Sequence, residues 1–231
     1  STAKDSVGDK AKIIAGTGTY STKESIEYTK MANDIGVDGI MIVTPYYSKP
    51  SQFGILKHFE EISKNTDLPI MAYNIPGRTA TLIEIDTLEK LVDDIGIHSI
   101  KDAVGDLEFS KNELEALKDK VDIYSGNDGE TIEFMKMGGK GVVSVASHVV
   151  GNEIYDLINH VLNDEVESAE HLQNQLLPLF DLLFEEPSPG PVKYLLTKTW
   201  EDVGSPLMPI TDISSELSNK LLDNFQKIKN N

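Results

Sequence analysis

The sequence predicts an α/β fold in which short parallel strands alternate with helices. The first observation is a series of short apolar runs, each bounded by glycine, proline or polar turn residues. The second is that a helical pattern separates each run from the next, which implies crossover connections and parallel pairing. The pattern fits an open doubly wound sheet or a (β/α) barrel. Short, evenly spaced strands that are apolar throughout favour the barrel.

The elements begin with a helix over residues 1–10 and an apolar strand over 12–17. Ser21 with Glu24 three residues later is a capping-box pattern, which predicts a helix that ends at Gly36. Residues 39–45 form a continuous apolar run, as expected for a strand buried on both faces.

The alternation continues after a loop at residues 46–50. A helix is expected over 51–64, a strand over 68–74 and a helix over 83–94. The break between this strand and helix contains Pro76, which cannot continue a central strand.

The next strand, residues 98–103, delivers Lys101 close to its carboxyl end. Helices over 110–118 and 131–137 then alternate with strands over 122–127 and 141–146, which makes about six β/α units in all.

Only helices are expected after residue 147, at 152–162, 165–184, 191–199 and 213–229. The chain therefore divides into a (β/α) barrel portion, residues 1–150, and a C-terminal helical region, residues 151–231. The second of these helices carries one apolar stripe, which is either core or a subunit contact. Its members are Leu172, Leu176, Leu179, Phe180 and Leu183.

The composition narrows the classes of function. The formal net charge is −17 and the basic residues are not clustered, so a nucleic-acid partner is not expected. The absence of cysteine excludes disulfides and thiol catalysis. No apolar run is long enough to span a membrane, and no signal peptide is recognised. We therefore expect a cytoplasmic protein.

The carboxyl ends of parallel strands meet on one rim, which is where ligands bind in such folds. Lys101, Tyr73 and Thr44 fall on this rim, and Arg78 follows in the next loop. A partly desolvated lysine attacks carbonyls as a free amine, and a neighbouring tyrosine can carry protons to and from the reacting oxygen. An arginine binds carboxylates in bidentate fashion. The alternative is a solvated lysine beside tyrosines that belong to the core.

Metal and cofactor signals are weak in this sequence. The histidines, at positions 58, 98, 148, 160 and 171, have no metal-ligand spacing, so no metal site is predicted. The glycine-rich segment 138–141 lacks the P-loop spacing and precedes a strand. No cofactor is expected.

Several motifs, in order along most of the chain, resemble those of the dihydrodipicolinate synthases, within the pyruvate-dependent class I aldolase family that includes N-acetylneuraminate lyase. The matching segments are Ile14-Ala15-Gly16-Thr17-Gly18, Val43-Thr44-Pro45-Tyr46-Tyr47, Tyr73-Asn74-Ile75-Pro76-Gly77-Arg78-Thr79, Ile100-Lys101-Asp102-Ala103, Tyr124-Ser125-Gly126-Asn127-Asp128 and Gly139-Lys140-Gly141-Val142-Val143-Ser144-Val145. The resemblance implies a TIM-type barrel and a lyase that condenses pyruvate with L-aspartate-4-semialdehyde to 4-hydroxy-tetrahydrodipicolinate, in lysine and diaminopimelate biosynthesis.

The resemblance also implies residue roles. Lys101 corresponds to the Schiff-base lysine, Tyr73 to the proton-relay tyrosine, and Tyr47 to a tyrosine that reaches a neighbouring subunit's site. Arg78 corresponds to the arginine that receives the aldehyde's carboxylate, and the sialic acid lyases lack an arginine at that place.

The pyruvate pocket is implied at Gly126 and Val143, with Thr44 counted among the substrate-binding residues. We expect a homodimer or homotetramer. We also expect no inhibition by L-lysine, because Tyr20 stands where lysine-sensitive members carry an asparagine, although Glu24 is retained.

The N-terminal part of the family pattern has no counterpart here. The family has two further strands before the segment that matches residues 12–17, and a Gly-Thr-Thr-Gly-Glu motif whose threonines bind pyruvate and link the two tyrosines. We expect either a truncated product or a naturally shortened form. The missing motif keeps open a catalytically weak relative that serves as a binding or assembly partner. A sibling pyruvate aldolase with another aldehyde also stays open, because Arg78 argues for an acidic aldehyde but does not identify it.

Overall fold

A computed structural model describes residues 1–230 and divides the chain into two compact units. The first unit contains residues 1–126 with 137–140, and the second contains residues 127–136 with the chain from 141 onward. These units are defined by packing. The division at residue 150, expected between a barrel portion and a helical region, stays a prediction.

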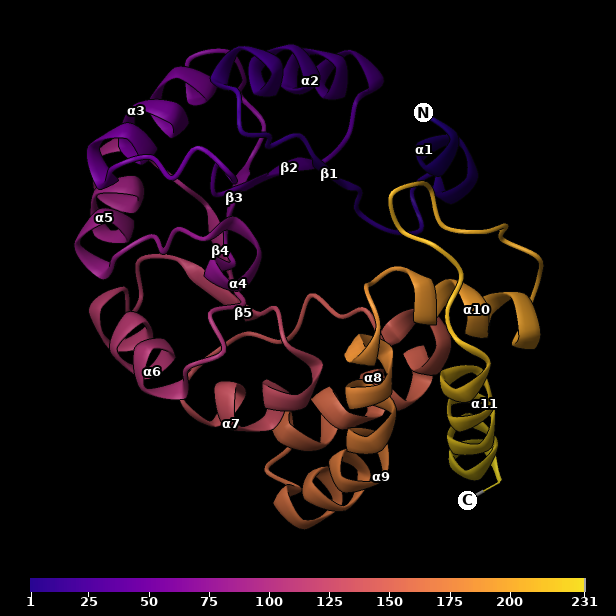
Figure 1. Cartoon of the computed structure of the whole chain (residues 1–231). Coiled ribbons are helices and arrows are strands. Elements are labelled where there is room, and N and C mark those ends of the chain that lie inside the picture. The colour runs from indigo at the N-terminus through magenta and orange to yellow at the C-terminus, as the bar shows by residue number, and fades with distance from the viewer. Residues whose placement is uncertain (231) are drawn as a thin grey trace. The chain divides into compact units, whose positions relative to one another are not determined.

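The first unit contains a parallel sheet of five strands in chain order. The strands are β1 (Ile14–Gly16), β2 (Gly39–Val43), β3 (Ile70–Asn74), β4 (Ser99–Asp102) and β5 (Asp122–Ser125). The helices are α1 (Thr2–Val7), α2 (Thr22–Ile35), α3 (Gln52–Ser63), α4 (Pro76–Thr79), α5 (Ile85–Lys90), a π-helical turn η1 (Leu91–Ile95) and α6 (Leu107–Ala116). In Figure 1, α2, α3, α5 and α6 form an arc along one side of the strands. The predicted α/β alternation is confirmed.

The strand expected at residues 141–146 is the exception. Only Val142 forms a bridge there, and no ladder extends from it. The Asp128 carboxylate accepts hydrogen bonds from the backbone N–H groups of Val145, at 3.2 Å, and Ala146, at 3.0 Å. Because a side chain takes these donors, they are not free to pair with a neighbouring strand. The prediction of a regular strand at this place is therefore wrong.

The two faces of the sheet carry different side chains, because successive residues of a strand point to opposite sides. Ile42, Ala72, Ile100 and Ile123 lie in register across β2 to β5 and are almost completely buried. Their row forms the apolar face of the sheet. The neighbouring rows point to the opposite face and contain the candidate catalytic residues.

Helix α2 begins with half of the predicted capping box. The Ser21 hydroxyl accepts the Glu24 backbone N–H at 3.4 Å, which confirms the N-cap. The Glu24 carboxylate contacts the Thr19 hydroxyl at 3.4 Å, and the Ser21 N–H donates to that same hydroxyl. Thr19 therefore takes the place that a complete capping box would give to a direct Glu24–Ser21 contact.

The second unit is helical. Its elements are the short turn η2 (Asp128–Glu130) and helices α7 (Thr131–Lys136), α8 (Ser147–Leu162), α9 (Val166–Glu185), α10 (Gly190–Thr199) and α11 (Ser215–Lys229). The apolar stripe of α9 belongs to the core of this unit, where Leu176, Leu179 and Leu183 are fully buried. This decides between the two interpretations of the stripe. Within residues 1–230, no helix has the length and apolarity to cross a bilayer.

Candidate active site

Strand register places four site positions in one row. Val43 pairs with Tyr73, Tyr73 with Lys101, and Lys101 with Tyr124. Side chains in register on parallel strands point to the same face of the sheet. The lysine and the tyrosine predicted from the sequence are therefore direct neighbours, near the carboxyl ends of their strands.

Lys101 is the buried member of this row, with an exposed fraction of 8%. Its Nζ atom lies 4.1 Å from the centroid of the Tyr73 ring, within the range of a cation–π contact. The strand therefore holds the amine against an aromatic face, in a place where little solvent reaches it. A strand-end amine of this kind is the group that imine chemistry requires.

Gly126 makes room for the lysine stem. A Cβ at this position would lie 2.9 Å from Lys101 Cε and 2.6 Å from the Cβ of Ala103. The Gly126 N–H also donates to the carbonyl of Asp102. Any larger residue at 126 would collide with the chain that carries the amine, so glycine is required there.

Gly18 also permits a close approach, here between the segment after β1 and the backbone of β2. A Cβ on Gly18 would lie only 2.5 Å from the backbone nitrogen of Val43. The segment after β1 can therefore approach β2 closely only because residue 18 has no side chain. Gly18 belongs to one of the motifs matched in the sequence, which alone does not indicate its role. A glycine directly after a short strand was the available signal.

A cavity of about 720 Å³ lies beside this row, within the first unit. Its lining combines aromatic, apolar and cationic side chains, as small-molecule sites do. The lining residues are Gly16, Gly18, Met41, Val43, Tyr46, Tyr47, Lys49, Tyr73, Ile75, Arg78, Thr79 and Ala80. Tyr73 joins the cavity to Lys101, because its ring contacts the amine and also contributes to the lining.

Arg78 belongs to α4, the short helix that follows β3, and it lines the cavity. It is the only arginine in a sequence whose formal net charge is −17. Burial raises the pKa of Tyr73, while the charge of Arg78 acts in the opposite direction. The Tyr73 hydroxyl therefore keeps its proton near neutral pH and is available as a proton donor.

The adjacent tyrosines lie on the loop after β2. Tyr47 is 91% exposed and its backbone φ is 69°, a conformation uncommon for a residue with a side chain. Tyr46 instead packs edge-to-face against Tyr20, with ring centroids 5.7 Å apart. Both tyrosines contribute to the cavity wall. The predicted tyrosine with a recorded contact to Lys101 is Tyr73.

Thr44 and Val143 are not among the residues that line this cavity. Thr44 is fully buried, and its hydroxyl donates to the backbone carbonyl of Tyr73 at 3.0 Å. Its recorded contact therefore holds β2 against β3. Val143 belongs to the second unit. The substrate-binding roles of both residues stay predictions.

The residue that sequence reasoning missed in this row is Tyr124. It pairs in register with Lys101, and burial together with the charge of Asp122 raises its pKa. Its position in the strand Asp122–Ser125, two residues before Gly126, was the available signal. For residues 1–230, no group of three or more histidine and acidic side chains has the arrangement of a metal site.

The chain is similar to proteins of one known family. The sequence model of the dihydrodipicolinate synthetase family matches residues 1–228. A 4-hydroxy-tetrahydrodipicolinate synthase from Halalkalibacterium halodurans is 42% identical over 220 residues, which cover 95% of this chain and 75% of that protein.

Solved structures give the same result for the fold. A dihydrodipicolinate synthase from Bacillus anthracis superposes with a TM-score of 0.93 at 42% identity, covering 96% of this chain and 76% of that one. An enzyme of the same name from Cyanidioschyzon merolae, solved with lysine bound, gives 0.94 at 38% identity and covers 98% and 77%. The predicted fold class, a TIM-type (β/α) barrel with a C-terminal helical extension, is confirmed.

Proposed function

Because the chain belongs to the dihydrodipicolinate synthetase family, we propose that it condenses pyruvate with L-aspartate-4-semialdehyde to give 4-hydroxy-tetrahydrodipicolinate. This reaction serves lysine and diaminopimelate biosynthesis. A cytoplasmic location, expected from the sequence, stays a prediction, as does the absence of a nucleic-acid partner.

The observation that carries the proposal is the contact between Lys101 and Tyr73 beside the cavity. In the proposed reaction, the Lys101 amine adds to the ketone carbon of pyruvate to form a carbinolamine. Loss of water, with the Tyr73 hydroxyl supplying the proton to the departing oxygen, gives the imine. The Tyr73 oxygen, which has lost its proton, takes a methyl proton to give an enamine, whose carbon attacks the aldehyde carbon, and Tyr73 returns the proton to the new alkoxide. The amino group of the aldehyde substrate then displaces Lys101 from the imine, which closes the ring and releases the product.

Arg78 supports an acidic aldehyde as the second substrate. It is a cation on the cavity wall, and a guanidinium pairs with a carboxylate through two parallel hydrogen bonds. The exposed position of Arg78 suits the substrate that arrives second, after pyruvate is attached deeper in the site. We assign Gly126, Val143 and Thr44 to the pyruvate pocket as part of the same proposal.

We also propose that the active form is a homodimer or homotetramer, with Tyr47 at a subunit contact. A Tyr47 ring that is 91% exposed on a loop beside the cavity supports this, because tyrosine is enriched at interfaces between protein chains. Sedimentation at the protein concentration of the assay tests the assembly. An active monomer would contradict it.

Borohydride trapping tests the chemistry. Incubation with pyruvate and sodium borohydride should add one reduced pyruvate to the protein, and peptide mapping should place it on Lys101. Lys49 is the matched control, because it is exposed and also lines the cavity. Labelling of Lys49, or of no lysine, would contradict the proposed mechanism.

Turnover with a panel of aldehydes tests the second substrate. L-Aspartate-4-semialdehyde should be preferred over neutral aldehydes of the same length, because only the former pairs with Arg78. Preference for a neutral aldehyde would support a sibling pyruvate aldolase. Trapping without turnover on any aldehyde would support a binding or assembly role.

A further inference from the structure

Asp102 follows the proposed nucleophile directly and points to the other face of the sheet. Its exposed fraction is 3%. One oxygen of its carboxylate accepts the Val104 N–H at 2.8 Å, and the other accepts the hydroxyl of Ser110 on α6. The Asp102 backbone carbonyl accepts the N–H of Gly126. Asp102 therefore ties the end of β4 to both β5 and α6.

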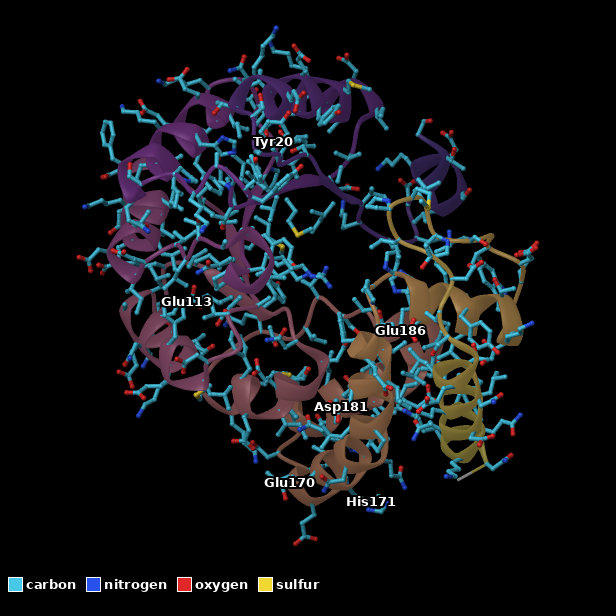
Figure 2. All side chains as sticks on the ribbon, viewed as in Figure 1. Tyr20, Glu113, Glu170, His171, Asp181 and Glu186 are labelled. Carbon is cyan, nitrogen blue, oxygen red and sulfur yellow. The ribbon has the colours of Figure 1, made fainter. Side chains whose placement is uncertain are left out.

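Glu113 lies on α6, three residues after Ser110, and is completely buried. Figure 2 shows it on the side of the helix that faces the strands. Among the described residues, no N–H or hydroxyl group donates to either of its carboxyl oxygens. The nearby charge is the carboxyl group of Asp102, which raises the pKa of Glu113.

Two buried carboxyl groups that act on each other's charge are not both ionised at low cost. Burial raises the pKa of Glu113 well above its usual range, and the charge of Asp102 raises it further. Burial also raises the pKa of Asp102, but the donors from Ser110 and Val104 favour its ionised form. The proton therefore resides on Glu113, and the negative charge resides on Asp102.

We propose that Glu113, in its protonated form, is a positioning residue that fixes Lys101 through the Asp102 carboxylate. The chain of contacts runs from Glu113 to Asp102, and from Asp102 through one peptide unit to Lys101. The Lys101 side chain already has little freedom, because Gly126 and Tyr73 lie against it. A small displacement of the strand end therefore changes the position of the amine relative to the cavity.

The proposal implies a response to pH. The groups that face this pair are Ser110 from α6, Ser125 in register with Asp102 on β5, and Asp106 at the start of α6, which acts on Asp102. Loss of the Glu113 proton would place two negative charges side by side in a buried space, and their repulsion would move the strand end. Activity should therefore fall on the alkaline side as Glu113 ionises.

The inference rests on the proposed function, and two variants test it. Glu113→Gln keeps the shape and an N–H donor without a titrating group, whereas Glu113→Leu removes the donor. Glu115→Gln is the control, because Glu115 lies exposed on the same helix. We expect Glu113→Leu to lower kcat about tenfold or more with little change in the KM for pyruvate, because the amine is misplaced. Glu113→Gln should restore most of that loss and remove the alkaline decline seen in the parent protein.

Infrared difference spectroscopy detects whether the Glu113 carboxyl group is protonated, and it does not depend on turnover. The carbonyl band of a neutral carboxylic acid should be present in the parent protein near neutral pH, lost in Glu113→Gln and retained in Glu115→Gln. No such band, or equal losses of kcat in the Gln and Leu variants, would overturn the inference. Failure of pyruvate trapping on Lys101 in the parent protein would instead overturn the proposed function.

Discussion

Gly126 lies directly against the stem of Lys101: a methyl group at residue 126 would come within 2.9 Å of the lysine Cε. The contact joins two neighbouring strands, since Lys101 is on β4 and Gly126 follows β5. Substitutions at this glycine therefore press on the lysine stem as well as on Ala103, whose Cβ would lie 2.6 Å away.

We expect Gly126→Ala to slow pyruvate trapping at Lys101 by about tenfold to a hundredfold, since small misplacements of a reacting group cost rates of that order. Overpacking should also lower the free energy of unfolding by about 1–3 kcal/mol. Rates of borohydride trapping and denaturant titrations measure the two effects. Gly151→Ala is the control, because no atom lies within 4 Å of a Cβ built there. Unchanged trapping in Gly126→Ala would show that Lys101 has more freedom than the structure indicates.

Arg78→Ala should raise the KM for L-aspartate-4-semialdehyde about tenfold or more and leave the KM for pyruvate nearly unchanged. A charge-assisted hydrogen bond to a carboxylate is worth about 1.5–3 kcal/mol, and the exposed position of Arg78 keeps the effect toward the lower end. Initial rates with each substrate varied in turn measure the two constants. Arg78→Lys should recover part of the loss, because it keeps the charge without the bidentate geometry. Equal effects on both substrates would assign Arg78 a structural role.

L-Lysine should not inhibit turnover at millimolar concentration. The Tyr20 ring packs against Tyr46, and the Glu24 carboxylate already contacts the Thr19 hydroxyl. An isolated carboxylate of this kind contributes about 0–1 kcal/mol to the binding of an exposed cation, which is too little for affinity in that range. Rates measured across an L-lysine titration, with D-lysine as the control for ionic strength, decide the question. Saturable inhibition specific for the L form would contradict the prediction.

Acidification should destabilise the first unit through His58. Its side chain is 4% exposed and its Nδ1 atom lies 2.9 Å from the Thr22 hydroxyl. Burial lowers the pKa of His58 to about 4, whereas an unfolded histidine titrates near its usual 6.5. Between pH 4 and pH 6.5 the unfolded state therefore binds more protons than the folded state. The contribution of His58 to the free energy of unfolding is complete above pH 6.5 and is lost as the pH falls toward 4.

The full contribution of His58 is up to about 3 kcal/mol, from roughly 1.4 kcal/mol for each pKa unit. Denaturant titrations between pH 7 and 4 measure it, and His58→Gln should flatten the dependence in that interval. The exposed His148 is the control, since His148→Gln should leave the slope unchanged. The same slope in the parent protein and in His58→Gln would show that another group is responsible.

The sequence allowed prediction of those features that depend on local pattern. Apolar runs predicted β1 to β5, and the Ser21 cap and Gly36 correctly marked the ends of α2. The same reasoning failed where a distant side chain intervenes. An apolar run at 141–146 does not reveal that Asp128 takes its backbone donors.

For the site, the expected positions of the strand ends predicted that Lys101 and Tyr73 are neighbours, because the carboxyl ends of parallel strands share one rim. The contribution of Tyr124 depends on register, which a single sequence does not reveal. The Glu113–Asp102 pair was also missed, because a helical glutamate is usually solvated and only packing makes this one buried.

Lys101 and Asp102 point to opposite faces of the sheet, and this separates the positions that can be varied in an engineered enzyme from those that should be kept. Positions in the lysine's row, such as Val43 and Tyr124, can be randomised to recruit new aldehydes, because their side chains do not enter the layer that contains Glu113. Positions in the aspartate's row should be held constant in such a library, because changes there would disturb the lysine in every clone alike. Selection for altered substrates is thus expected to enrich substitutions at every second residue of β2 and β5 and to leave the intervening residues untouched.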